Sequence, residues 1–446
     1  MSTIAFHRSQ FRVSANGRHL ITGAGAPFVW LADSAIALTR RLDRGDIDLY
    51  LRTRAAQRFT VIHTAALSGA DARGAVNAYG HLPFEDGDPM RPVEAYFAHL
   101  DLAVLRANTL GLAVAIQPLG AELVGPGAFT PASAGVFAAY LARRFRDQAV
   151  IWVLGGGEGA EDDLHQTVWN TMGSTLKEHT QGRQLVAYLS SVAPSRGAPW
   201  CQGQAWLDLA LHRSGPELTA QPWASVAAGY ASQPVKPLID GDPGREDQPA
   251  PDGETEGRLS ARQERMVAYW SVFAGASGHT YANHSVCCFH QGGIAGDQAR
   301  SSWEDALHDP AAEQMHFLRH LLESRPFQSR VPDQGLLPRA PADPALHQRA
   351  TRGDDDEFGG ERGSYAFIYT PRAAPVTVDL TRLTGSLVVA SWFDPRTGRS
   401  LWLGQFPTRG QRTFQPPGDD DWVLVLDDSL HNYQPIGQGA NRSMSF

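Results

Sequence analysis

Short apolar runs alternate with longer segments of helical period along the first three quarters of this chain. Eight of the apolar runs have the length that is typical of buried parallel strands, and the run at 150–154 is also rich in β-branched residues. Strands that alternate with helices in this way predict a parallel (β/α)8 barrel, also called a TIM barrel. The predicted strands are residues 28–32, 59–64, 112–117, 150–154, 185–190, 207–211, 237–240 and 278–281. The predicted helices are residues 44–56, 92–109, 131–146, 163–179, 217–228, 258–274 and 311–323. The run at 207–211 would also suit a helix.

The two ends of the chain predict smaller units. Asn16-Gly17 predicts the tight turn of a β-hairpin before the barrel. Residues 331–363 are rich in Pro, Gly, Ala and charged side chains, which indicates a linker or crossover. Four strand-like runs after residue 363 favour a small C-terminal antiparallel β-sandwich. We therefore expect an α/β barrel domain over 1–330, a linker over 331–363 and a β-sandwich over 364–446.

Two of the predicted barrel strands end in acidic residues. The strand at 150–154 runs into three glycines and then Glu158, and the strand at 237–240 runs into Asp242. In TIM-barrel enzymes the chemistry sits at the carboxyl ends of the strands. Two carboxylates at that edge are the minimum equipment for hydrolysing a glycosidic bond.

Charge and composition argue against several other classes of function. The formal net charge is −8 and there is no basic stripe, which argues against nucleic-acid binding. No apolar run approaches the roughly 20 residues that span a bilayer, so we expect no membrane segment. The N-terminus lacks the basic start and apolar core of a signal peptide. This predicts a cytoplasmic protein, although a secreted protein without its leader would look the same.

The cysteines and aromatic residues add less. Three cysteines without framework spacing indicate reduced thiols or at most one bridge. Most of the eleven Trp and eleven Tyr residues are expected in cores, although aromatic faces also stack on sugars. Asn77, Tyr79 and Trp206 are predicted to contact a ligand, whereas Trp392 and Trp402 are expected between the C-terminal sheets.

Ten segments, taken in order, resemble the apiosidase-like family, glycoside hydrolase family 140. They cover nearly the whole chain, and their order carries the resemblance more than any single motif. The resemblance implies a TIM-barrel glycosidase followed by a β-domain of a type named for collagen binding. The matching segments are residues 16–18, 30–34, 59–62, 77–80, 151–156, 240–243, 273–281, 283–285, 325–327 and 392–398.

The positions that the resemblance implies are catalytic differ in this chain. Gly157 stands where the family has an aspartate, and Glu158 follows it; Asp242 stands where the family has a glutamate. The longer Glu158 side chain could reach back into the cleft, so we predict Glu158 as acid/base and Asp242 as nucleophile or base. Alternatively, a displacement of about 1 Å can cost about 10²-fold in rate, which would leave a sugar-binding protein without catalysis.

Three more departures lie near these two carboxylates. Residues 213–216 read Arg-Ser-Gly-Pro where the family tends to have Gln-Ser-Gly-His. Arg245-Glu246 replaces Tyr-Glu, and we expect Glu246 to be solvated in its loop. Cys287 replaces a tryptophan, and a buried structural thiol is the expected role of the Cys287–Cys288 pair.

Other polar residues are predicted to contact the substrate. Asp33 ends the first strand, where the resemblance implies a ligand for a sugar hydroxyl and a helix N-cap is the alternative. Asp240 either supports Asp242 or replaces it as the catalytic group. The resemblance implies that His279 partners a hydroxyl or a carboxylate. The histidine spacings do not converge on a metal site, so we predict no metal and no cofactor. The predicted substrate-binding residues are Asp33, His63, Asn77, Tyr79, Trp206, Asp240, His279 and His284.

Together these features predict a retaining or inverting exo-glycosidase that acts on a terminal sugar of a plant or microbial oligosaccharide. Carboxyl groups about 5–5.5 Å apart would indicate retention and about 6.5–9.5 Å inversion, and the shorter Asp242 favours the wider gap. A non-catalytic carbohydrate-binding protein is the main alternative, and an adaptor that binds protein through its tail is a third. Assembly into a homo-oligomer stays open.

Overall fold

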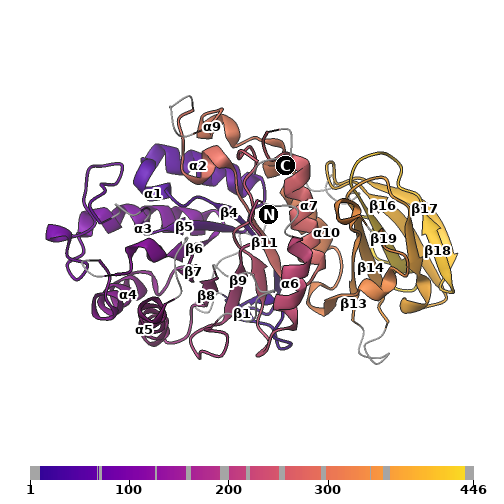
Figure 1. Cartoon of the computed structure of the whole chain (residues 1–446), viewed down its shortest axis with the longest axis horizontal. Helices are drawn as coiled ribbons and strands as arrows, with labels where there is room; N and C mark the ends of the chain where they lie inside the picture. The colour runs from indigo at the N-terminus through magenta and orange to yellow at the C-terminus, as the bar shows by residue number, and fades with distance from the viewer. Residues whose placement is uncertain are drawn as a thin grey trace.

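The computed structural model contains the predicted barrel (Figure 1). It describes residues 11–67, 69, 73–125, 128–156, 162–190, 200–216, 221–250, 257–292, 298–341, 343–354 and 362–436. Eight parallel strands close in the order β10-β11-β4-β5-β6-β7-β8-β9. These strands are β4 (Trp30–Ser34), β5 (Val61–Ala65), β6 (Ala113–Gln117), β7 (Val150–Gly155), β8 (Val186–Leu189), β9 (Leu209–His212), β10 (Leu238–Asp240) and β11 (Gly278–Tyr281). The prediction of a (β/α)8 barrel is confirmed, including the strand at 207–211 that would also have suited a helix.

The helices of the barrel begin where capping residues allow. The Asp43 side chain accepts hydrogen bonds from the backbone of Gly45 and Asp46 at the start of α2, and Thr130 precedes Pro131 at the start of α4. The long helices are α2 (Arg44–Ala56), α3 (Glu94–Thr109), α4 (Pro131–Phe145), α5 (Asp163–His179), α6 (Pro222–Ala231), α7 (Ala261–Phe273) and α10 (Pro310–Glu323). The short helices are α1 (Leu38–Arg41), α8 (His284–Cys287) and α9 (Trp303–Ala306).

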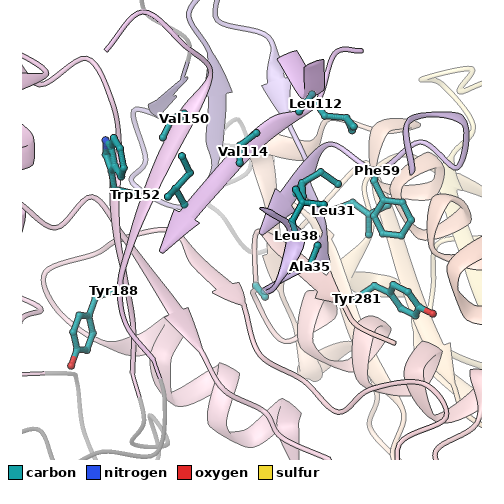
Figure 2. Close-up of a cluster of buried hydrophobic side chains, with 14 of the residues drawn as sticks. Leu31, Ala35, Leu38, Phe59, Leu112, Val114, Val150, Trp152, Tyr188 and Tyr281 are labelled. Carbon is teal, nitrogen blue, oxygen red and sulfur yellow. The ribbon is translucent and has the colours of Figure 1, made fainter. Parts of the chain in front are cut away.

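Alternate residues of each barrel strand pack on opposite sides of the wall. Trp30 and Ala32 of β4 belong to the cluster inside the barrel, whereas Leu31 belongs to the cluster between the wall and the helices. Figure 2 shows part of this outer cluster, including Leu31 and Trp152. Because side chains alternate along a strand, this register decides which polar side chains near a strand end can face the cleft.

A three-stranded antiparallel sheet contributes to the interior cluster of the barrel. It consists of β1 (Phe11–Val13), β2 (Leu20–Thr22) and β3 (Pro27–Phe28). Phe11 and Phe28 pack with ring centroids 4.5 Å apart and join the cluster inside the barrel. The predicted turn lies between β1 and β2, where Gly17 adopts a positive φ of 73° that favours glycine.

The C-terminal part consists of two antiparallel sheets that enclose a second core. The larger sheet has the order β12-β13-β14-β19-β16-β17, and β15 pairs with β18 in the smaller one. Trp392 is fully buried in this core as expected, but Trp402 is 72% exposed, so its predicted place in the core is wrong. The strands are β12 (Arg330–Pro332), β13 (Arg349–Gly353), β14 (Tyr365–Thr370), β15 (Val376–Asp379), β16 (Leu387–Phe393), β17 (Ser400–Pro407), β18 (Gln411–Phe414) and β19 (Trp422–Asp428).

The segment expected to be a linker contributes strands to the larger sheet. β12 pairs with β13, and β13 pairs with β14. Arginines make β12 and β13 look polar in the sequence, but Arg330 and Arg352 are buried with partners. Arg352 lies 2.6 Å from Asp333, and Arg330 donates at 2.6 Å to the carbonyls of Val272 and Ala276 in the barrel domain. Part of the segment at 331–363 therefore belongs to the C-terminal sheet.

Helix α7 joins the two domains, and Figure 1 shows α7 and α10 between the barrel and the C-terminal strands. Tyr269 of α7 stacks on Tyr369 of β14, with ring centroids 5.0 Å apart. Arg265 of α7 forms a buried ion pair of 2.7 Å with Asp421. No helix in the described part of the chain is long and apolar enough to cross a membrane.

Candidate functional site

The structure describes one of the two predicted catalytic carboxylates. Glu158 falls in residues 157–161, outside the described residues, so its geometry is not stated. The chain leading to it leaves β7 through Gly155 and Gly156, which both have a φ of +78°. A Cβ on Gly155 would lie 2.5 Å from the Leu189 carbonyl oxygen, so only glycine fits this turn.

Asp242 lies just beyond β10, where main-chain hydrogen bonds tie it to the end of β9. Its N–H donates to the His212 carbonyl at 3.3 Å, and its own carbonyl accepts from the Gly215 N–H at 3.2 Å. The Asp242 side chain is 35% exposed, and its Oδ2 lies 3.3 Å from Nε of Arg213. Asp242 is therefore a carboxylate at the carboxyl-terminal edge of the barrel strands that solvent can reach.

Two arginines set the charge around Asp242. Burial raises the pKa of Asp242, while the positive charges of Arg213 and then Arg245 oppose that rise. The Arg245 side chain is half-buried, and its carbonyl accepts a hydrogen bond from the Gln248 N–H at 2.9 Å. The charges of Cys287, Cys288 and Asp242 raise the pKa of Arg245 against the effect of its burial. The guanidinium groups favour the ionised form of Asp242.

His63 faces the interior of the barrel. It lies two residues after Val61, which belongs to the interior cluster, and its register partner on β4 is Ser34. Burial lowers the pKa of His63 to about 4, so the imidazole is neutral near pH 7. Its Nε2 has no hydrogen-bond partner among the described residues. A neutral imidazole with an unpartnered nitrogen can bind a hydroxyl group, which keeps His63 as a candidate for substrate contact.

Asp33 faces away from the cleft, so its prediction as a substrate ligand is wrong. It shares the outer face of β4 with Leu31 and is fully buried between the wall and α2. Its Oδ2 accepts hydrogen bonds of 2.6 Å from both Tyr50 and Arg54 of α2. Nor is Asp33 a helix N-cap. It is one half of a buried ion pair that ties the first strand to its helix.

Asp240 and His279 form a second buried network outside the barrel wall. Asp240 accepts hydrogen bonds from Ser214 at 2.8 Å and Ser271 at 2.7 Å, and its Oδ2 lies 3.2 Å from His279 Nδ1. Burial alone would raise the pKa of Asp240, but His279 above all holds it below its ordinary value. Both side chains are fully buried. Of the two roles considered for His279, only that of carboxylate partner fits, and the predicted substrate contacts of both residues are wrong.

Asn77 and Tyr79 shape the loop after β5. The Asn77 side chain accepts hydrogen bonds from the backbone of Tyr79 at 3.0 Å and His81 at 3.1 Å, which closes a turn. The Tyr79 hydroxyl accepts from the Arg44 N–H at 3.0 Å, at the start of α2. Asn77 is 3% exposed, whereas half of Tyr79 is exposed. Both polar groups brace the loop, and a substrate contact of the exposed Tyr79 ring stays a prediction.

Trp206 and His284 have different outcomes. Trp206 is 3% exposed and donates to the Asn170 side chain at 2.9 Å. Its ring covers Gly173 of α5, where a Cβ would lie 2.3 Å from it, so the predicted ligand stacking is wrong. His284 begins α8, is half-buried, and has its ring centroid 5.7 Å from that of His290. Its predicted substrate contact stays untested.

Sequence reasoning missed a buried carboxylate in the same loop as Asp242. Glu246 was expected to be solvated, but it is 3% exposed. Its carboxylate accepts hydrogen bonds from the Tyr281 hydroxyl at 2.6 Å and from the N–H of Ala311, in the first turn of α10, at 3.0 Å. Burial raises the pKa of Glu246 to about 7. The sequence predicted an exposed Glu246 because its loop is rich in glycine, proline and acids. The one available signal for a buried partner was the apolar strand that contributes Tyr281.

Within the described ranges, no three His, Cys, Asp or Glu side chains are grouped so that they could hold a metal ion. The comparisons with known proteins point to carbohydrate chemistry. The family model described as "Apiosidase-like, catalytic domain" matches residues 14–329. A second model, described as "Putative collagen-binding domain of a collagenase", matches residues 331–427. No curated protein matches this chain.

Solved structures agree with these matches over nearly the full length. A glycoside hydrolase family 5 protein from Bacteroides vulgatus is 26% identical with a TM-score of 0.85, covering 96% of this chain and 95% of its own. A structure described as a glycoside hydrolase is 27% identical with a TM-score of 0.85, covering 97% of this chain and 100% of its own. Both similarities extend across the barrel and the C-terminal sheets.

Proposed function

Because this chain belongs to the apiosidase-like family of catalytic domains, we propose that it is an exo-acting glycosidase for a terminal sugar of an oligosaccharide or glycoside. The observation that carries the proposal is Asp242, a partly exposed carboxylate at the end of a barrel strand, where such enzymes place their chemistry. The neutral His63 on the interior face of β5 supports it, because it can bind a sugar hydroxyl.

In the proposed reaction, Asp242 acts in its ionised form. The charges of Arg213 and Arg245 counter the effect of burial on its pKa, which suits a nucleophile or a base. Glu158 is proposed as the acid that protonates the leaving oxygen, a role that requires its neutral form. Its separation from Asp242 would decide between retention, at about 5–5.5 Å, and inversion, at about 6.5–9.5 Å.

One observation favours the alternative of a carbohydrate-binding protein without catalysis. Arg213 already lies 3.3 Å from the Asp242 carboxylate and shares its exposure to solvent. A guanidinium group in that position competes with a substrate for the carboxylate oxygens. If the ion pair persists when sugar binds, Asp242 would hold the ligand without attacking it.

Hydrolysis of a panel of aryl glycosides and plant oligosaccharides tests the proposal. Asp242→Asn and Glu158→Gln are each expected to lower the rate by about 10²–10⁴-fold, the range for a positioned acid or base. Asp86→Asn is the matched control, because Asp86 is 87% exposed and its φ of 51° suits asparagine. If wild type cleaves none of the panel while one of the sugars raises its melting temperature, the binding alternative replaces the enzyme.

A further inference from the structure

Two adjacent thiols lie at the end of α8, beside the barrel strand that carries Ser34. Cys287 is 1% exposed and Cys288 is half-buried. Their sulfur atoms are 4.0 Å apart, and Cys287 Sγ lies 3.8 Å from Ser34 Oγ. All three cysteines lie in the described part of the chain and none forms a disulfide, so Cys287 and Cys288 are present as two thiols.

The turn that holds the two sulfurs is fixed on both sides. Before it, the Asn283 side chain accepts hydrogen bonds from the backbone of Ser285 and Val286 and donates to Asp309 at 2.7 Å. After it, Phe289 adopts a φ of 54°, an unusual conformation for a bulky residue. Its buried ring packs edge-on against Tyr50, and this packing holds the backbone in that conformation. The two sulfurs are therefore held side by side.

The charges around the pair make its two members chemically different. The hydrogen bond from the Cys288 thiol, and then the charge of Arg245, outweigh burial and lower the pKa of Cys287 to about 6. The same contact raises the pKa of Cys288. Apart from the two thiols and Ser34, the groups that act on them are Arg245 and Asp242 from the loop after β10, and Arg41 of α1. Near neutral pH this leaves one thiolate beside one thiol.

We propose that Cys287 and Cys288 are a modification site that closes into an intramolecular disulfide on reaction with hydrogen peroxide or another small hydroperoxide. The Cys287 thiolate attacks one oxygen of the peroxide and the O–O bond breaks. The other oxygen departs as hydroxide, and Cys287 becomes a sulfenic acid. The Cys288 sulfur then attacks the Cys287 sulfur and forms the S–S bond, and the hydroxyl group leaves as water with the proton of the Cys288 thiol. In sum, two thiols and one hydrogen peroxide give one disulfide and two waters.

The burial of Cys287 selects a small oxidant. Cys287 is almost fully covered and Cys288 is half-buried, so a small hydroperoxide should react faster than a peptide-sized disulfide such as oxidised glutathione, which has to bring its own sulfur onto the covered atom. The resulting bond is also expected to be easily reduced. Adjacent Cα atoms are about 3.8 Å apart, below the 4.4–6.8 Å usual for disulfides, and strain makes the bond more reducible. The site is therefore reversible.

Closing the disulfide changes the charge beside the candidate catalytic carboxylate. It removes the thiolate that faces Arg245, and the negative charges of Asp242 and Cys287 no longer repel each other. We expect the pKa of Asp242 to fall on oxidation. This consequence concerns the proposed function, but the disulfide itself is detected without any glycosidase activity.

Mass spectrometry of the full chain after graded hydrogen peroxide treatment and alkylation tests the site. The peptide with Cys287 and Cys288 is expected to lose two hydrogen atoms and to regain two alkylatable thiols after dithiothreitol, while the fully buried Cys201 stays a thiol. The oxidation rate should rise with pH around a midpoint near 6, instead of the 8.5 of an ordinary cysteine. Oxidised glutathione at the same concentration should react more slowly.

Two variants separate this site from general cysteine oxidation. Cys288→Ser should take up oxygen on Cys287 and form no intramolecular disulfide. Arg245→Gln should move the midpoint of the pH–rate profile upward, because it removes the positive charge that favours the thiolate. The proposal would be overturned if wild type kept both thiols at a hydrogen peroxide dose that fully oxidises free reduced glutathione. So would a bridge that joins two chains or includes Cys201.

Discussion

The buried carboxylate of Glu246 makes a quantitative prediction about stability and pH. Two hydrogen bonds, from Tyr281 and from the first turn of α10, favour its ionised form. Burial and the nearby charge of Asp309 favour the neutral form, and burial is the largest effect, so the pKa rises from 4.5 to about 7. At 1.36 kcal/mol per pKa unit, this rise corresponds to about 3 kcal/mol.

The sign of the pH effect follows from the raised pKa. Glu246 binds its proton more tightly in the folded chain than in the unfolded chain, so its contribution to stability is fully present below pH 4.5. That contribution is lost as the pH rises from 4.5 through about 7. Glu246→Gln mimics the neutral acid, because its amide can accept from the Ala311 N–H and donate to the Tyr281 oxygen. We therefore expect the variant to exceed wild type in stability at pH 8 by up to about 3 kcal/mol.

Thermal and urea unfolding at pH 5 and pH 8 measure this difference. The gap in stability between the two pH values should be smaller in Glu246→Gln than in wild type. Glu323→Gln is the matched control, because Glu323 pairs with Arg319 on the exposed side of α10 and should change stability by less than about 0.5 kcal/mol. If Glu246→Gln were less stable than wild type at pH 8, and the difference in stability between pH 5 and pH 8 were unchanged, burial would not be the largest effect on the pKa of Glu246.

The sequence was sufficient to predict the barrel but not the direction of its polar side chains. The parallel strands are buried on both faces, so no alternation of polar and apolar residues marks the inner side. Asp33 and Asp240 were therefore assigned to the cleft, although both lie on the outer face with Arg54 and His279. Small residues such as Ala32 line the interior and were the available cue.

The missed strands and the misplaced tryptophans have a related cause. β13 reads as a polar segment because it contains Arg349 and Arg352. Arg352 is buried against Asp333, and such pairing is invisible in a single sequence. Trp206 lies against a glycine of α5 that is distant in sequence, so its burial depends on tertiary packing. Trp402 lies on β17, an edge strand of the larger sheet, and therefore has no neighbouring strand on one side.

Two further substitutions test how the wall of the barrel is built. Gly241→Ala should destabilise the chain by about 1–3 kcal/mol, because a Cβ there would lie 2.8 Å from the Leu211 side chain and the interior is already filled. Urea unfolding measures this loss. An unchanged unfolding midpoint would contradict the close contact between Gly241 and Leu211. Asp33→Asn should cost about 3–5 kcal/mol, because it leaves the fully buried Arg54 charge without its partner. Arg54→Met in the Asp33→Asn background removes that stranded charge and should recover part of the loss. If Asp33→Asn alone were harmless in thermal unfolding, Asp33 would not be the counterion of a buried arginine, and its assignment to the outer face of β4 would have to be withdrawn.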